Sequence, residues 1–234
     1  VNTWALYTNS EPEIWTKATD YINFAIYNYS KWLGDYPYNQ CTVVDGTIAA
    51  GAGMEYPNIT IVGKSGVKEI LETVIIHEVG HNWFYGILGS NERIYPWMDE
   101  GINSYYESRS IMEKYPHDLF GNVNELSSLN FLGQLTGLDK LNYNAFSFFE
   151  YLLSASSHTD QPISRPAPVY TDLNYATIVY KKTAVAFYYL SKYLGDSLFD
   201  RCMQTYYEQW KFKHPQPEDI KSVFTSVSGK NLDW

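Results

Sequence analysis

The chain of 234 residues has no long apolar run, few cysteines and no excess of basic charge. No apolar stretch reaches the roughly 18 residues that a membrane-spanning helix needs, so we expect no membrane span in this segment. A net charge of −9 without a basic face argues against a nucleic-acid partner. No secretory signal peptide opens the chain. The separation of Cys41 and Cys202 fits no metal motif, and we interpret both as buried small hydrophobic residues.

The most informative stretch is residues 77–81, which read His-Glu-Val-Gly-His. On a helix the fourth residue along returns to the same face, so the imidazoles of His77 and His81 can point at one spot. Glu100 follows nineteen positions after His81. Two imidazole nitrogens and one carboxylate oxygen make a three-ligand zinc site whose fourth position is open to water. Glu78, one residue past the first ligand, can stand beside the metal as the base that deprotonates that water.

Each part of this motif also has a simpler explanation. Two histidines at this spacing occur by chance on helices, as satisfied surface or core residues. Glu100 taken alone could be a carboxylate that complements the dipole at a helix N-terminus. We favour the metal site because apolar residues at helical spacing lead into the motif and predict one helix over residues 67–84. A second helix is predicted from Trp97 to Lys114, which places Glu100 in its first turn on a separate element.

The remaining pattern predicts a small α/β lobe over residues 1–66 and a mainly helical lobe over residues 67–234. The first lobe is expected to hold three strands and one helix, at residues 4–8, 41–45, 59–62 and 11–33. Residues 118–172 are expected to form short helices joined by loops. Helices are predicted over residues 175–194 and 197–212, and a last one from Pro217.

Three segments together give a family resemblance. They are residues 51–57, residues 77–84 with Glu100-Gly101 downstream, and residues 180–183. In order and spacing the chain resembles the catalytic domain of the gluzincin aminopeptidases, the family of aminopeptidase N and leukotriene hydrolase. The resemblance implies an α+β, thermolysin-like zincin catalytic domain, with a small mixed β-sheet lobe before a mainly helical lobe. It also implies one zinc ion per chain.

The resemblance further implies how a peptide would bind. Glu55 would hold the free α-amino group of the substrate, and the backbone at Gly53 and Met54 would hydrogen-bond its main chain. The alternative is that Glu55 is a strand-end residue in an ordinary turn. Tyr180 would stabilise the oxyanion that forms on the scissile carbonyl. Tyr175 lies five residues earlier and is predicted to face a different direction on the helix.

Several positions depart from the family pattern or have open roles. Tyr56-Pro57 stands where Asn-Trp is usual, and Lys181 and Thr183 replace Glu and Gly. A metal-bound histidine usually donates its other ring hydrogen to a carboxylate or carbonyl. Asp99, Glu107 and the pair at residues 91–92 are candidates for that role, and each could equally be a helix cap or a solvated side chain.

We therefore predict a zinc metallopeptidase, in first place an aminopeptidase that removes N-terminal residues from peptides. An endopeptidase or a hydrolase of non-peptide substrates on the same zinc site is the first alternative. A zinc-containing peptide-binding module whose catalysis has been lost is the second. The resemblance also implies that the chain is a catalytic domain excised from a longer protein with an N-terminal β-rich domain. By resemblance alone the variant motifs favour an exported bacterial member; the location is otherwise unknown.

Overall fold

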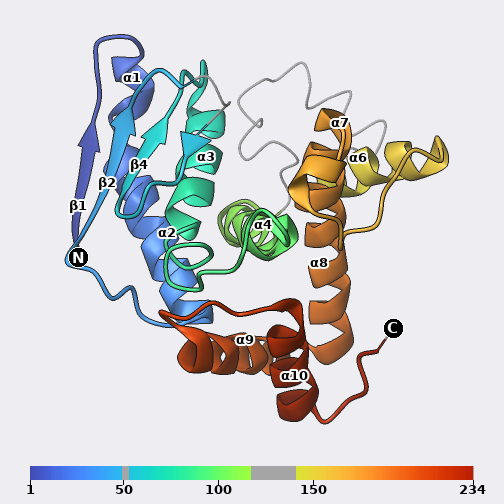
Figure 1. The fold of residues 1–234 in the computed structure, drawn as a ribbon. Helices are drawn as coiled ribbons and strands as arrows, with labels where there is room; N and C mark the ends of the chain where they lie inside the picture. The colour runs from blue at the N-terminus through green and yellow to red at the C-terminus, as the bar shows by residue number, and fades with distance from the viewer. Residues whose placement is uncertain (49–52, 117–140, 234) are drawn as a thin grey trace.

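A computed structural model describes residues 1–48, 53–116 and 141–233 of the chain (Figure 1). A small mixed sheet lies beside a larger, mainly helical region, which confirms the predicted α+β arrangement. Within the described residues, Cys41 and Cys202 are buried, as predicted, and they do not form a disulfide. None of the helices in these ranges combines the length and apolar character needed to cross a bilayer.

The described residues form a four-stranded sheet in the order β1-β2-β4-β3. The first three strands, β1 (Asn2–Leu6), β2 (Gln40–Asp45) and β4 (Ile59–Val62), run parallel. The short β3 (Gly53–Met54) runs antiparallel to β4 and forms one edge of the sheet. Side chains alternate between the two faces of a strand. The sheet therefore packs one apolar face, which includes the fully buried Val43 and Val62, against helices.

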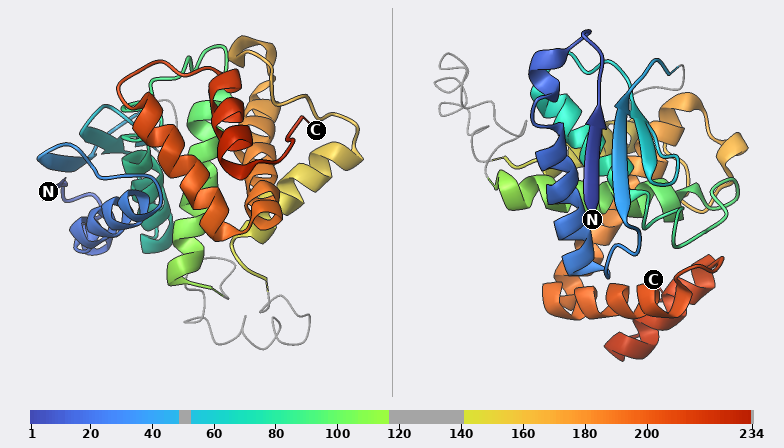
Figure 2. Two further views of the ribbon diagram at one scale, coloured as in Figure 1. Left: turned by 90° about the horizontal axis from the view of Figure 1, so that it is seen from below. Right: turned by 90° about the vertical axis from the view of Figure 1, so that its left-hand side faces the viewer.

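Two helices cover this face: α2 (Ala18–Trp32) and α3 (Lys68–Gly80) (Figures 1 and 2). The helix predicted over residues 11–33 is divided, because a separate short helix, α1 (Pro12–Trp15), precedes α2. Trp15 and Ala18 lie on either side of the break, and both are in the core, where they are 1% and 0% exposed. The predicted helix over residues 67–84 ends early, at Gly80. His81 nevertheless keeps right-handed helical dihedrals, so its relation to His77 is retained.

The helix predicted from Trp97 to Lys114 begins with a π-helical turn, η1 (Trp97–Gly101), and continues as α4 (Ile102–Lys114). The helix predicted over residues 175–194 likewise begins as a π-helix, η5 (Tyr175–Lys182), before α8 (Thr183–Leu194). The two segments pack closely at Gly101, where a Cβ would lie 2.5 Å from the Val179 carbonyl oxygen. Absence of a side chain there allows the close approach.

The rest of the described chain surrounds this pair of segments. The remaining elements are α6 (Asn144–Ser156), the 3-10 turn η4 (Ala167–Val169), α7 (Asp172–Asn174), α9 (Asp196–Trp210) and α10 (Pro217–Ser228). Helices α9 and α10 lie at the bottom of Figure 1, near the C-terminal end, and α6 lies on the right. Much of the prediction for residues 118–172 lies outside the described residues; within them, α6 is a helix of 13 residues rather than a short one.

Candidate active site

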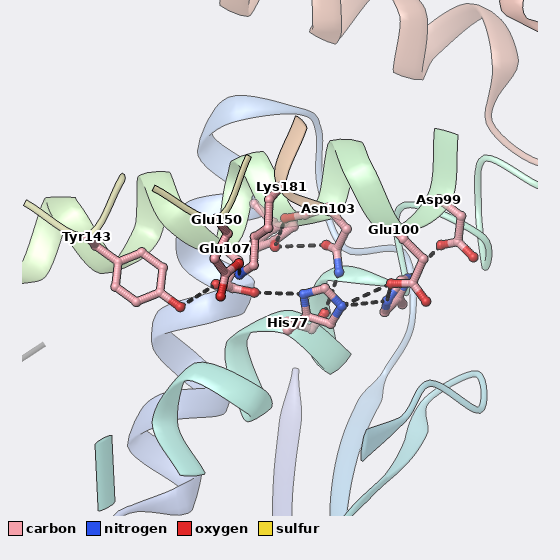
Figure 3. Close-up of polar contacts among 10 residues, drawn as sticks. His77, Asp99, Glu100, Asn103, Glu107, Tyr143, Glu150 and Lys181 are labelled. Carbon is pink, nitrogen blue, oxygen red and sulfur yellow. Dashed lines mark hydrogen bonds and ion pairs between the residues drawn. The ribbon is translucent and has the colours of Figure 1, made fainter. Parts of the chain in front are cut away.

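The structure brings the three predicted metal ligands together. Helix α3 carries His77 and ends directly before His81. The π-turn η1 carries Glu100, which faces His77 (Figure 3). The two Nε2 atoms lie 3.1 Å apart, and Oε2 of Glu100 lies 3.2 Å from each of them. The three donors therefore form a nearly equilateral triangle.

This triangle fits a zinc ion. Donors bound to zinc at about 2.0 to 2.1 Å in a tetrahedron lie about 3.3 Å apart, close to the separations found here.

The electrostatics around the two histidines also favour a cation at this point. Burial lowers the pKa of His77, but hydrogen bonds to Glu100 and Glu107 outweigh it and raise the pKa to about 10. Burial also opposes protonation of His81, yet Asp99 and Glu100 raise its pKa well above the ordinary value. The carboxylates thus favour positive charge at this point, which a divalent cation would supply.

Each histidine is oriented by a carboxylate on its other nitrogen. Asp99 Oδ1 lies 2.6 Å from Nδ1 of His81, and Glu107 Oε2 lies 2.9 Å from Nδ1 of His77. Asp99 is 1% exposed and Glu107 7%, so neither is a solvated side chain. Such contacts fix the ring orientation and the tautomer of a metal ligand. The residue pair 91–92 does not do this, because Asn91 accepts a hydrogen bond from the backbone of Ile94.

Glu78 lies on the same helical turn and faces a cavity of about 240 Å³. The described residues that line it are Gly53, Glu55, Thr73, Val74, His77, Glu78, His81, Glu100, Glu107 and Tyr180. Glu78 is 7% exposed, and its Oε2 has no hydrogen-bond partner within the described part of the chain. Burial raises the pKa of Glu78 to about 7, against the opposing effect of the two histidines. A carboxylate with these properties can exchange a proton with a group in the cavity.

Strand β3 and the residue that follows it bring two of the predicted substrate-binding residues to the same cavity. Gly53 and Glu55 both line the cavity. One oxygen of Glu55 lies within 4.8 Å of ligand atoms of both His81 and Asp99. Met54 is not among the described residues that line the cavity, and its carbonyl accepts a hydrogen bond from Thr60 Oγ1. Any contribution of Met54 would therefore come from its backbone.

The π-helix η5 brings two tyrosines to the site. The Tyr180 ring stacks on His77, with centroids 5.9 Å apart. Burial and the nearby Glu100 raise the pKa of Tyr180 well above its ordinary value, so the phenol stays protonated and can donate a hydrogen bond. The prediction that Tyr175 faces away is wrong, because its ring meets that of Tyr180 edge-on at 6.0 Å. A π-helix bonds residue i to residue i+5, so its wider turn aligns positions that an α-helix separates.

Comparison with known proteins agrees with this geometry. Residues 21–234 match the Peptidase family M1 domain. The chain belongs to peptidase family M1. Its sequence is 24% identical over 159 residues to human (Homo sapiens) endoplasmic reticulum aminopeptidase 2, covering 65% of the chain and 14% of that protein. It is 24% identical over 234 residues to mouse (Mus musculus) aminopeptidase Q, covering 90% of the chain and 39% of that protein.

Solved structures of the M1 type share the fold. An M1 zinc metallopeptidase from Deinococcus radiodurans aligns with a TM-score of 0.63 and 17% identity over 91% of the chain and 40% of its own. Yeast LTA4 hydrolase aligns with a TM-score of 0.69 and 16% identity over 98% of the chain and 36% of its own. The chain thus spans less than half the length of these relatives. The family confirms the predicted enzyme class, a metallopeptidase of the hydrolases.

The structure shows what surrounds two of the residues that depart from the usual family motifs, Thr183 and Tyr56. Thr183 packs against Gly101, at the contact that joins η5 to η1. Tyr56 is 50% exposed. The turn after it is held by Asn82, whose Oδ1 accepts a hydrogen bond from the backbone N–H of Asn58 at 3.0 Å. Asn82 is not among the residues predicted from the sequence; its position directly after His81 is the one signal there.

Proposed function

We propose that this M1 domain is the catalytic domain of a zinc aminopeptidase. The observation that carries the proposal is the triangle of His77, His81 and Glu100 donors beside a cavity that Glu78 and Tyr180 also line. A binding site alone would not need a buried carboxylate with an unpartnered oxygen next to such a triangle. In this proposal His77, His81 and Glu100 hold the zinc.

Zinc, when bound, supplies a Lewis acid and a water of lowered pKa. With zinc held there, the Glu78 carboxylate would accept a proton from a water in the cavity and return it to the leaving amine. The Tyr180 hydroxyl donates a hydrogen bond to the substrate carbonyl oxygen, where negative charge develops. Burial, which raises the pKa of Glu78 above its ordinary value, favours a carboxyl group that can both accept and return a proton.

Substrates in this proposal are peptides with a free N-terminus. Glu55 lines the same cavity as Glu78, and one of its oxygens lies within 4.8 Å of a ligand atom of His81, so it can bind an α-ammonium group while the first peptide bond lies at the metal. The backbone at Gly53 and Met54 would align the peptide main chain along the edge of β3. Relatives are more than twice as long as this chain. We propose that a β-rich domain of the same protein adds to the substrate cleft, and that the protein is exported.

The test combines metal analysis with paired substrates. The purified protein is expected to hold one zinc per chain. It should cleave an alanyl fluorogenic amide about 10- to 100-fold faster, as kcat/KM, than the N-acetylated amide, because the charge-assisted contact to Glu55 is lost. Glu55→Gln should narrow this preference, whereas the exposed Glu113→Gln should not change it.

Other outcomes identify the alternatives. Equal cleavage of free and acetylated substrates would instead indicate an endopeptidase or a hydrolase of other substrates. Zinc and peptide binding without any turnover would indicate a peptide-binding module. Absence of stoichiometric zinc would overturn the proposal altogether.

A further inference from the structure

The carboxylate that orients His77 is itself held from a distant part of the chain. Glu107 uses Oε2 for His77 Nδ1 at 2.9 Å, and its Oε1 accepts a hydrogen bond from the Tyr143 hydroxyl at 2.8 Å (Figure 3). Tyr143 directly precedes helix α6. Thr73 of α3 also hydrogen-bonds Tyr143, which ties the phenol to the helix that carries the metal motif. Both oxygens of Glu107 therefore have a hydrogen-bond partner: one is His77, and the other is Tyr143 at the start of α6.

A cation also lies close to Glu107. Lys181 follows Tyr180 in η5, and its charge acts on Glu107. Its Nζ lies 4.0 Å from Oε2 of Glu150, a residue of α6 (Figure 3). Glu150 is half exposed, so this ion pair by itself adds little stability. In this arrangement the Lys181 side chain lies on the side of the site where Glu107 lies (Figure 3).

The two histidines differ in what supports them. The partner of His81 is Asp99, a residue of η1 that is 1% exposed. The partner of His77 is Glu107, a longer side chain with one more rotatable bond. A hydrogen bond to the second oxygen of such a carboxylate further restricts its rotamers and so the orientation of the histidine that it contacts. For Glu107 that hold comes from Tyr143.

We propose that Tyr143 and Lys181 are positioning residues of the metal centre, which act through Glu107 to keep His77 oriented toward the ion. The inference rests on the proposed zinc site. It gives α6 a role in metal retention, because α6 carries Glu150 and begins directly after Tyr143. Neither side chain touches the substrate in this proposal.

The primary measurement is the zinc dissociation constant, obtained by competition with a chromophoric chelator at fixed pH. Tyr143→Phe keeps the ring and removes only the donor. We expect it to weaken zinc binding about tenfold, the lower end of the range for residues that support a metal ligand. Lys181→Met should weaken binding by a smaller factor. The matched controls, Tyr27→Phe and Lys192→Met at exposed positions, should bind zinc as the parent protein does.

A double-mutant cycle tests whether Tyr143 acts through Glu107. In a Glu107→Gln background, Tyr143→Phe should cause little further loss of zinc affinity, because the carboxylate that it positions is gone. The absorption spectrum of the cobalt(II)-substituted protein should shift in Tyr143→Phe and stay unchanged in Tyr27→Phe. A general loss of folding would instead lower the thermal stability of the metal-free protein without this pattern.

Two results would overturn the inference. The first is parental zinc affinity in Tyr143→Phe. The second is an equal loss of affinity with and without Glu107. In both cases the parent protein still binds zinc, so the proposed function would stand. If the parent binds no stoichiometric zinc, it is the proposed function that fails.

Discussion

The Glu78 side chain lies directly against Gly53, so that a Cβ at residue 53 would overlap its carboxyl group. Strand β3 and helix α3 meet at this point without any side chain from β3 between them. We expect Gly53→Ala to push Glu78 from its place and to lower kcat at least tenfold, while zinc content and KM change little. Steady-state kinetics with metal analysis checks this. Unchanged kcat would mean that Glu78 tolerates displacement and that Gly53 has no catalytic consequence.

Replacement of the proposed base, Glu78, should lower the catalytic rate without removing the zinc. Glu78→Gln keeps the size of the side chain but removes the proton acceptor. We expect a loss of about 10² to 10⁴ in kcat with one zinc still bound per chain. Glu69→Gln, in the first turn of the same helix, is the matched control and should keep full activity. Turnover near the parental level in Glu78→Gln would assign proton transfer to another group.

The neighbouring tyrosines of η5 give a second comparison. Tyr180→Phe should lower kcat by about 10² or more, because a donor to the developing oxyanion is lost. Tyr175→Phe should have a smaller effect, since in the present geometry Tyr180 is the one that stacks on His77 and lines the cavity. Both variants keep the ring contact at 6.0 Å. A larger loss in Tyr175→Phe would transfer the oxyanion role to Tyr175.

The hydrogen bond from Asn58 to Asn82 should matter for substrate binding. Asn82 follows the metal motif, and its carbonyl oxygen holds the turn that comes after Glu55. Asn82→Ala should leave the partly buried N–H of Asn58 without this acceptor and cost about 1 kcal/mol of unfolding free energy. We also expect KM for substrates with a free amino end to rise several-fold. Chemical denaturation and steady-state kinetics measure the two effects, with the exposed Asn91→Ala as control. A parental KM would remove Asn82 from the binding of the amino end.

Acid stability should depend on Asp45, at the end of β2. Partial burial raises the pKa of Asp45, but hydrogen bonds from Thr8 and Ser10 outweigh burial and lower it below the ordinary value. A lowered folded-state pKa means that this contribution is present above the unfolded pKa and is lost as the pH falls through the folded pKa. We expect Asp45→Asn to destabilise the protein at pH 7 by about 1 kcal/mol and by less near pH 3. Urea unfolding at both pH values tests this, and an equal difference at both would contradict it.

The sequence was sufficient to predict a feature wherever the residues that determine it lie in one short segment. The spacing of His77 and His81 defines a shared helix face, and Glu100 begins the next helical element. The strands at residues 41–45 and 59–62 were also recognisable from β-branched residues between turns. These features depend on neighbours within a few positions, so the sequence displays them directly.

Other features depended on partners far away in the chain. Asp99 and Glu107 could not be distinguished from capping or solvated residues until their contacts with His81 and His77 were known. The π-helix η5 was expected as an α-helix, and this single difference misplaced Tyr175.

The sequence by itself determined which residues we propose as zinc ligands and as the base, and the order of most elements, because each prediction follows from short-range spacing and residue chemistry. Only the tertiary structure decided how the histidines are supported, which glycines make room for Glu78 and Thr183, and where Tyr143 acts. The physical reason is that a π-turn and a buried carboxylate are unfavourable in isolation. Packing and hydrogen bonds from segments distant in sequence stabilise them, and the local pattern does not reveal those partners.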